Sequence, residues 1–206
     1  MNMIAVASPA IKLLFERVGR PEVHNRPALL LPGGAGAVIV CNHAGWVDSL
    51  WMTYAVYPRP LRHMSKRELF SSSLARWFLE QGGSVPIDRT DPSPSSIKSA
   101  VDLLRNGELL LVFPAGTRKE NALFKRGAAT IALHARVPIV PARYEGPKTM
   151  HLSHLLGRPR ISVKFGAVIT TDGLSPDRSA ASALTARLQT SIEDLRSVSS
   201  AQLYPV

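Results

Sequence analysis

The sequence predicts an α/β domain in which helices flank a mixed or largely parallel sheet. Short apolar runs alternate along the chain with longer stretches whose apolar residues recur at helical spacing. This alternation is typical of strands connected by crossover helices. The chain has 206 residues, 45% of them hydrophobic and 19% charged, which suits one domain with one core. In sheets of this class, functional side chains gather where the strands end.

The chain is predicted to begin with a short amphipathic helix over residues 9–18. The apolar side chains of one face are Ile11, Leu14, Phe15 and Val18. Such a face suits either packing on the core or contact with a membrane surface, with the basic residues toward lipid head groups. Residues 20–36 contain three prolines and are interpreted as a connector, with a short strand near residues 29–31. We therefore separate residues 1–35, an amphipathic helix and connector, from a main domain at residues 36–206.

The remaining elements are predicted from the period of their apolar residues and from the glycines and prolines between them. The predicted strands cover residues 38–41, 61–65, 84–87, 108–113, 137–144 and 161–169. The predicted helices cover residues 46–57, 66–80, 95–105, 127–135 and 177–198. The last of these helices has one apolar face, which predicts that it packs on the core through Leu184, Leu188, Ile192 and Leu195.

The chain is strongly basic. Lys and Arg outnumber Asp and Glu by 25 to 15, which gives a net charge of +10 and a pI of about 10.4. Such a charge favours anionic partners: nucleic acid, phosphorylated metabolites or an acidic membrane surface. Aromatic residues make up 6% of the chain, too few for a platform on which single-stranded bases stack. We therefore predict no nucleic-acid partner.

The single cysteine excludes an intramolecular disulfide bond and fits exposure to the cytoplasm. Cys41 lies inside an apolar run and is interpreted as a packed side chain rather than a nucleophile. No uninterrupted apolar run reaches the roughly 18 residues of a membrane-spanning helix. Residues 27–47 lack Asp, Glu, Lys and Arg, but Pro32 and the glycines after it interrupt any helix there. Residues 1–20 lack the early positive charge and the cleavage site of a secretory signal.

The most informative stretch follows the apolar run at residues 38–41 and reads Asn42-His43-Ala44-Gly45-Trp46-Val47-Asp48. Residues five apart on one helix point roughly 140° away from each other, so His43 can meet Asp48 only from outside the helix. A turn at Gly45 permits this because glycine has wide backbone freedom. A carboxylate on one imidazole nitrogen would make the other a general base for a substrate hydroxyl. A buried histidine beside a helix-capping aspartate explains the same spacing, and both interpretations stay open here.

A second candidate site residue is Arg89, which follows the predicted strand at residues 84–87. A planar guanidinium can bind two phosphate oxygens at once. The alternative is a surface arginine paired with Asp88.

A third candidate segment reads Phe113-Pro114-Ala115-Gly116-Thr117-Arg118 and is followed by Lys125 and Arg126. Glycine lets the backbone approach a ligand closely. The cations stand just before the helix predicted at residues 127–135, whose N-terminus also attracts anions. These features favour a phosphate site, and a solvated basic loop is the alternative.

Residues 137–142 read Val-Pro-Ile-Val-Pro-Ala, in which two prolines bracket an apolar pair. They suit either the wall of a hydrophobic cleft or a core strand with prolines at its ends, and the core strand is preferred. His151 and His154 form a pair without further ligand spacing, so we predict no metal site.

These segments, taken in order, resemble the four motif blocks of the glycerolipid acyltransferases. The corresponding residues are Asn42-His43 with Asp48, residues 85–89, residues 113–118 and residues 137–141. Residues 66–70 also resemble a segment that this family often has between its first two blocks. The chain therefore looks like a lysophospholipid acyltransferase, similar to the PlsC-like 1-acylglycerol-3-phosphate acyltransferase family, with residues 36–206 as the acyltransferase domain.

The resemblance implies transfer of a fatty acyl group from acyl-CoA or acyl-carrier protein to the hydroxyl of a lysophospholipid. The implied acceptor is 1-acyl-sn-glycerol-3-phosphate and the product is phosphatidate. His43 would be the general base and Asp48 would orient it. The resemblance places four residues around the acceptor phosphate, and the basic loop adds a fifth: Arg89, Gly116, Thr117, Arg118 and Lys125.

The thioester is already activated, so neither a covalent acyl-enzyme nor a cofactor or metal is expected. A membrane-borne acceptor and the positive net charge predict peripheral binding at the cytoplasmic face of an anionic membrane.

One residue departs from the family pattern, because the third block usually has Glu where this chain has Ala115. The departure leaves two alternatives open. One is an acyltransferase that uses another acceptor, such as a lyso-ornithine lipid. The other is a catalytically weak protein that binds anionic lipids.

Overall fold

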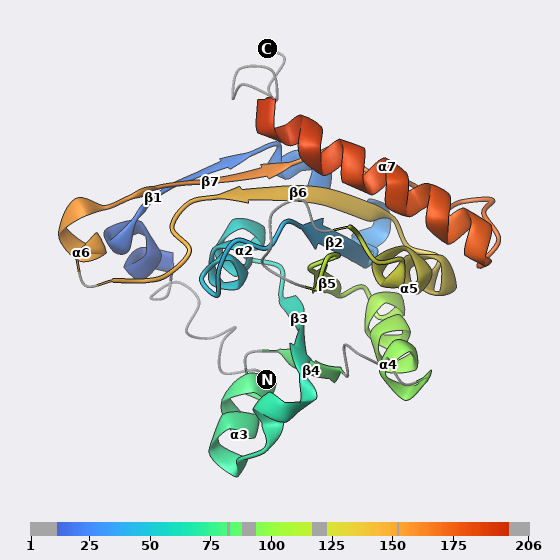
Figure 1. Ribbon diagram of the computed structural model, residues 1–206, viewed down its shortest axis with the longest axis horizontal. Helices are drawn as coiled ribbons and strands as arrows, with labels where there is room; N and C mark the ends of the chain where they lie inside the picture. Colours follow the sequence, from blue (N-terminus) through green and yellow to red (C-terminus); the bar gives the residue numbers. More distant parts are fainter. Residues whose placement is uncertain (1–11, 82, 88–93, 117–122, 152, 198–206) are drawn as a thin grey trace.

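The computed structural model describes residues 12–81, 83–87, 94–116, 123–151 and 153–197. Within these residues, seven strands form one sheet in the order β1-β7-β6-β2-β5-β3-β4 (Figure 1). The strands are β1 (Arg20–His24), β2 (Ala37–Cys41), β3 (Leu61–Lys66), β4 (Ser84–Ile87), β5 (Leu109–Val112), β6 (Ile139–Glu145) and β7 (Arg160–Phe165). All neighbours run parallel except β6 and β7, which run antiparallel. The prediction of an α/β fold with a mixed, largely parallel sheet is confirmed.

Helices cover both faces of the sheet. The described helices are residues 12–18, α2 (Asp48–Val56), α3 (Ser73–Gln81), α4 (Pro94–Arg105), α5 (Gly127–Ala135), α6 (His154–Gly157) and α7 (Arg178–Ser197). Short 3-10 helices are η1 (Arg26–Leu29), η2 (Pro32–Gly34) and η3 (Arg67–Phe70). One buried cluster joins the sheet to α2 and residues 12–18, and a second joins it to α4, α5 and α7. None of the described helices is long and apolar enough to cross a membrane.

The central strand β2 explains why its sequence is continuously apolar. All of its residues are buried, and their side chains alternate between the two clusters. Ile39 and Cys41 face α2, whereas Val38 and Val40 face α4, α5 and α7. A parallel strand covered on both faces has no polar side, which is why its pattern does not alternate.

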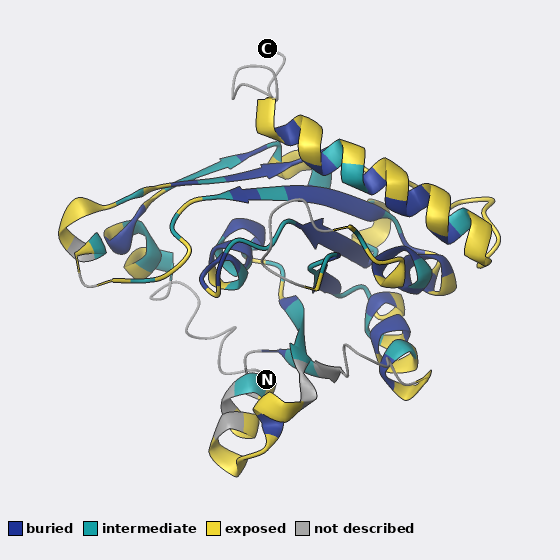
Figure 2. Cartoon of the chain, in the orientation of Figure 1, coloured by how far each residue is buried: buried dark blue, intermediate teal, exposed yellow. Residues whose placement is uncertain are grey.

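The closing helix α7 packs as its apolar period predicts. Leu184, Leu188, Ile192 and Leu195 are buried, and Figure 2 shows a buried stripe along a helix that is otherwise exposed or intermediate. Residues 137–142 also follow the preferred interpretation. They enter β6, which lies between β2 and β7 and is buried at Ile139 and Val140. They form a core strand.

Several boundaries differ from the predictions. The connector assigned to residues 20–36 contains β1, which pairs in parallel with β7, and residues 29–31 form no strand. The predicted helix over residues 66–80 is divided into η3 and α3. On the N-terminal helix, Phe15 and Val18 pack on the core, but Leu14 is 58% exposed. Core packing therefore holds for two of the three described residues of the predicted face, and Ile11 lies outside the described residues.

Candidate active site

Five strands end at the same edge of the sheet, because β6, β2, β5, β3 and β4 all run in one direction. Ligands of open α/β sheets bind at this edge. The segment between β2 and α2 lies there and includes His43. The sequence predicted that this helix begins at residue 46, but α2 begins at Asp48. The turn is therefore longer than expected.

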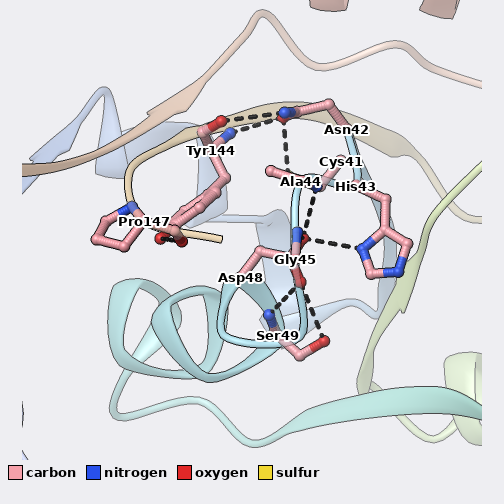
Figure 3. Close-up of polar contacts among 9 residues, drawn as sticks. All are labelled: Cys41, Asn42, His43, Ala44, Gly45, Asp48, Ser49, Tyr144 and Pro147. Carbon is pink, nitrogen blue, oxygen red and sulfur yellow. Dashed lines mark hydrogen bonds and ion pairs between the residues drawn. The ribbon is translucent and has the colours of Figure 1, made fainter. Parts of the chain in front are cut away.

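His43 lies outside the helix and folds back on its first residue. Its Nδ1 is 2.9 Å from Oδ2 of Asp48 (Figure 3). A carboxylate only accepts hydrogen bonds, so this contact assigns the ring proton to Nδ1 and leaves Nε2 as the basic nitrogen. The geometry that the sequence required for a histidine–aspartate pair is therefore present.

The Asp48 carboxylate is fully buried, at 0% exposure, and has several further donors. Oδ2 accepts hydrogen bonds from the backbone N–H groups of Ala44 at 2.9 Å and Gly45 at 3.0 Å. Oδ1 accepts one from the backbone N–H of Ser49 at 2.7 Å. Backbone donors at a helix N-terminus stabilise a buried negative charge. Asp48 therefore both folds the turn and holds the imidazole.

Phe113, directly after β5, forms one side of the imidazole site. Its ring is stacked on that of His43, with centroids 4.1 Å apart and planes inclined by 21°. The stacking follows from the topology, because β2 and β5 are parallel neighbours that end side by side. It brings the first and third sequence segments together.

An apolar cavity of about 220 Å³ borders this ring. Its wall comes from β3, β5, α4 and α5 and the loop before α5: Met64, Ile97, Val112, Phe113, Pro114, Gly116, Lys125, Gly127, Ala128, Thr130 and Ile131. Hydrocarbon suits such a lining. The sequence placed a hydrophobic cleft wall at residues 137–142 as one alternative, whereas this cavity lies on the other side of β2, next to β5.

Gly116 and Lys125 lie beside each other at this cavity. Gly116 has a φ of +64°, and a Cβ added to it would lie 4.0 Å from Nζ of Lys125. The backbone N–H of Lys125 donates to the carbonyl oxygen of Pro114 at 2.9 Å, which closes the loop between them. The structure thus brings these two predicted residues together at the cavity that Phe113 also lines. Arg89, Thr117 and Arg118 lie outside the described residues.

Two other titratable side chains near the pair are shielded from solvent, Cys41 completely and His63 in part. Burial, followed by the charge of Asp48, raises the pKa of the Cys41 thiol far above its ordinary value. This agrees with the interpretation of Cys41 as a packed side chain. Burial lowers the pKa of His63 to about 4, and its Nε2 contacts Oγ1 of Thr53 at 3.0 Å. His63 is therefore a neutral, partly buried histidine, which the sequence did not single out.

Sequence reasoning also missed how the turn is held from β6. The side-chain amide of Asn42 bonds to both backbone polar atoms of Tyr144: Nδ2 donates to the carbonyl oxygen at 3.0 Å, and Oδ1 accepts from the N–H at 2.8 Å. Asparagine next to His43 was visible in the sequence, but its partner is 102 residues away. Only the sheet order reveals the contact.

Gly45 has no room for a side chain. A Cβ at this position would lie 1.8 Å from the backbone oxygen of Lys148, far inside contact distance. We expect Gly45→Ala to lower kcat by at least about 10²-fold, because a shift of about 1 Å at a catalytic group has that effect. The free energy of unfolding should fall by ~1–3 kcal/mol. Gly157→Ala is the matched control, because no atom lies within 4 Å of its added Cβ.

Steady-state kinetics and chemical denaturation of the two variants test this prediction. Gly157→Ala should resemble the wild type in both measurements. If Gly45→Ala also has wild-type kcat and stability, Gly45 does not pack against Lys148 as closely as described.

Comparison with known proteins identifies the family of this chain. The family model described as Acyltransferase matches residues 20–145. The chain is 34% identical over 201 residues to the 1-acyl-sn-glycerol-3-phosphate acyltransferase of Bacillus subtilis (strain 168), covering 94% of this chain and 96% of that protein. It is 35% identical over 158 residues to the enzyme of the same name from Streptococcus pneumoniae, covering 76% and 58% of the two chains.

The fold also has a solved counterpart. The crystal structure of the 1-acyl-sn-glycerophosphate (LPA) acyltransferase PlsC from Thermotoga maritima superposes with a TM-score of 0.65 at 18% identity. The match covers 93% of this chain and 80% of that one. At this identity the likeness concerns the fold, whereas the bacterial relatives match in sequence over most of the chain. The chain belongs to the PlsC-like 1-acyl-sn-glycerol-3-phosphate acyltransferase family.

Proposed function

We propose that this protein transfers a fatty acyl group from an acyl-CoA or acyl-carrier-protein thioester to the free hydroxyl of 1-acyl-sn-glycerol-3-phosphate, giving phosphatidate. The observation that supports this most strongly is the His43–Asp48 contact of 2.9 Å, at a strand end beside an apolar cavity. The name of the Bacillus subtilis relative, which matches over 94% of this chain, supports the choice of acceptor.

In the proposed reaction, Nε2 of His43 accepts the proton of the acceptor hydroxyl as the oxygen attacks the thioester carbonyl. The new C–O bond gives a tetrahedral intermediate. Its collapse breaks the C–S bond, and the proton on Nε2 passes to the departing thiolate. Asp48 holds the other ring nitrogen and stabilises the imidazolium that exists between the two transfers. The thioester supplies the activation, so the protein forms no covalent acyl intermediate.

The third segment supplies the proposed substrate contacts. The apolar cavity next to Phe113 holds hydrocarbon from an acyl chain, and Lys125 at its wall binds the acceptor phosphate. Gly116 lets the loop backbone approach the same group. Arg89, Thr117 and Arg118 are proposed to complete the phosphate site on the strength of the family resemblance alone.

The acceptor is tested by thiol release from palmitoyl-CoA and from acyl-carrier protein with a panel of lysolipids. Ala115, in place of the usual glutamate, is the reason to include lyso-ornithine lipid in the panel beside lysophosphatidate. Release that depends on lysophosphatidate supports the proposal. Release with lyso-ornithine lipid alone would replace the acceptor, and no release from folded protein would favour a lipid-binding protein.

We further propose that the protein binds the cytoplasmic face of an anionic membrane from the periphery. Large apolar side chains are exposed on η3 and α3: Leu69 by 53%, Leu74 by 68% and Trp77 by 44%. Figure 2 shows much of this region as exposed. Apolar side chains on a chain of net charge +10 suit an interface with anionic head groups.

We expect flotation of the protein with liposomes that contain anionic lipid. Leu74→Glu should weaken flotation, because it places a charge on the proposed contact face. The exposed leucine of α6 gives a matched control in Leu156→Glu. Absence of flotation with and without anionic lipid would contradict peripheral binding.

A further inference from the structure

The chain leaves the sheet at the residue just before His43. Backbone pairing of β2 with β6 ends at Cys41 opposite Ala142. Beyond that point the connection is made by a side chain, because the Asn42 amide bonds to the N–H and the carbonyl oxygen of Tyr144 (Figure 3). The backbone is thus free to turn toward α2 while the sheet contact continues through the amide.

Tyr144 also holds the segment that follows β6. Its side chain is buried, with 1% exposure, and its Oη donates to the carbonyl oxygen of Pro147 at 2.8 Å. We name residues 144–148, the last two residues of β6 and the three that follow, the β6 exit segment, and this hydrogen bond ties the two parts together. The backbone oxygen of Lys148 in this segment packs against Cα of Gly45 so closely that no Cβ fits between them.

The β6 exit segment therefore contacts the turn between β2 and α2, residues 42–47, on both sides of His43. Asn42 is fixed one residue before the histidine, and Gly45 is packed two residues after it. The turn between these points sets the direction of the imidazole together with the Phe113 ring and the Asp48 carboxylate. Because Gly45 also donates to Asp48, a movement of this turn changes the contact between Nδ1 and Oδ2.

We propose that Asn42 and Tyr144 are positioning residues for the His43–Asp48 pair. Neither side chain touches substrate in this assignment, which rests on the proposed role of His43. Asn42 fixes the backbone from which His43 projects, and the Tyr144 hydroxyl fixes the segment on which Gly45 rests. A catalytic group must be held within a fraction of an ångström, so loss of either contact lowers turnover without removing a reacting group.

The kinetic test uses the full chain with Asn42→Ala and Tyr144→Phe. Asn42→Ala should lower kcat by about 10²-fold, with KM for donor and acceptor each within about twofold of the wild type. Tyr144→Phe keeps the ring and loses one hydrogen bond, so its kcat should fall by about fivefold.

Thr171→Val is the matched control. Its Oγ1 donates to the carbonyl oxygen of Val137 at 3.1 Å. This buried hydrogen bond lies just before the start of β6, at the opposite end of that strand from Tyr144. Thr171→Val should lower the melting temperature as Asn42→Ala does, yet keep wild-type kcat. Equal kcat in Asn42→Ala and Thr171→Val would overturn the proposal. So would a fall in kcat/KM of Asn42→Ala that comes from KM alone.

A spectroscopic readout separates positioning from folding and needs no substrate. The proton between Nδ1 of His43 and the Asp48 carboxylate should give a strongly downfield ¹H NMR signal, absent from His43→Ala. The signal should broaden or disappear in Asn42→Ala and persist in Thr171→Val. If Asn42→Ala does not fold, Asn42→Asp, which keeps the acceptor for the Tyr144 N–H, takes its place. An unchanged signal in the folded Asn42 variant overturns the proposal whether or not the wild type is active on the lipids tested.

Discussion

Replacing Asp48 with asparagine is expected to lower kcat by about 10³- to 10⁴-fold, the size of effect that follows loss of the carboxylate in a histidine-based triad. The carboxylate accepts from His43, from the N–H groups of Ala44 and Gly45, and from that of Ser49. An asparagine must turn its NH₂ group toward one of these sets of donors. It therefore disturbs the ring tautomer or leaves a backbone N–H unpaired.

The same change should reduce the free energy of unfolding by ~2–4 kcal/mol, because a buried charge-assisted hydrogen-bond set is broken. Asp177→Asn is the matched control. Asp177 caps α7 by accepting from the N–H of Ala180 at 2.8 Å on the protein surface. Asparagine caps helices about as well as aspartate, so this control should lose less than ~0.5 kcal/mol and keep its kcat. Near-normal turnover of Asp48→Asn would show that the pair is structural only.

Replacing His43 with alanine is expected to lower acyl transfer by at least about 10³-fold while lipid binding persists. The imidazole supplies the base, whereas the cavity and the loop at Lys125 are unchanged by the substitution. Folding should be retained, because Asp48 keeps its three backbone donors. Thiol release and vesicle binding, measured on the same preparation, check both halves of this prediction.

The matched control for that experiment is His134→Ala. His134 is an exposed histidine of α5 whose Nδ1 contacts the carbonyl oxygen of Thr130 at 2.9 Å. It should keep wild-type turnover and binding. Substantial turnover in His43→Ala would assign the base to another residue, and loss of binding together with turnover would point to a folding defect.

The sequence predicted the parts of the site that depend on local spacing. The His43–Asp48 pair needed only a turn between a strand and a helix, and the continuous apolar run of β2 marked where the strand ends. The exact start of α2 was not predictable, because Asp48 bonds backward to the turn and so begins the helix two residues later than the apolar pattern suggests. Local pattern thus located the residues but not the length of the turn.

Contacts between distant segments could not be predicted from the sequence. β1 pairs with β7 about 140 positions further on, and its charged residues gave no strand pattern. The Asn42–Tyr144 contact and the cavity beside Phe113 depend on which strands are neighbours in the sheet. The predicted helix over residues 66–80 failed for a different reason. Its apolar period continues through a break after Phe70, whose carbonyl oxygen accepts instead from the guanidinium of Arg76.

The most direct test of the central claim is whether thiol release requires the hydroxyl that His43 is proposed to deprotonate. Wild-type protein would receive palmitoyl-CoA with either lysophosphatidate or its 2-deoxy analogue, which keeps the chain and the phosphate but lacks that hydroxyl. General-base transfer predicts thiol release with lysophosphatidate, matched one to one by phosphatidate, and none with the analogue. Release with the analogue would reveal an acyl-enzyme or simple hydrolysis, and no release with lysophosphatidate from folded protein would contradict the assignment of this acceptor.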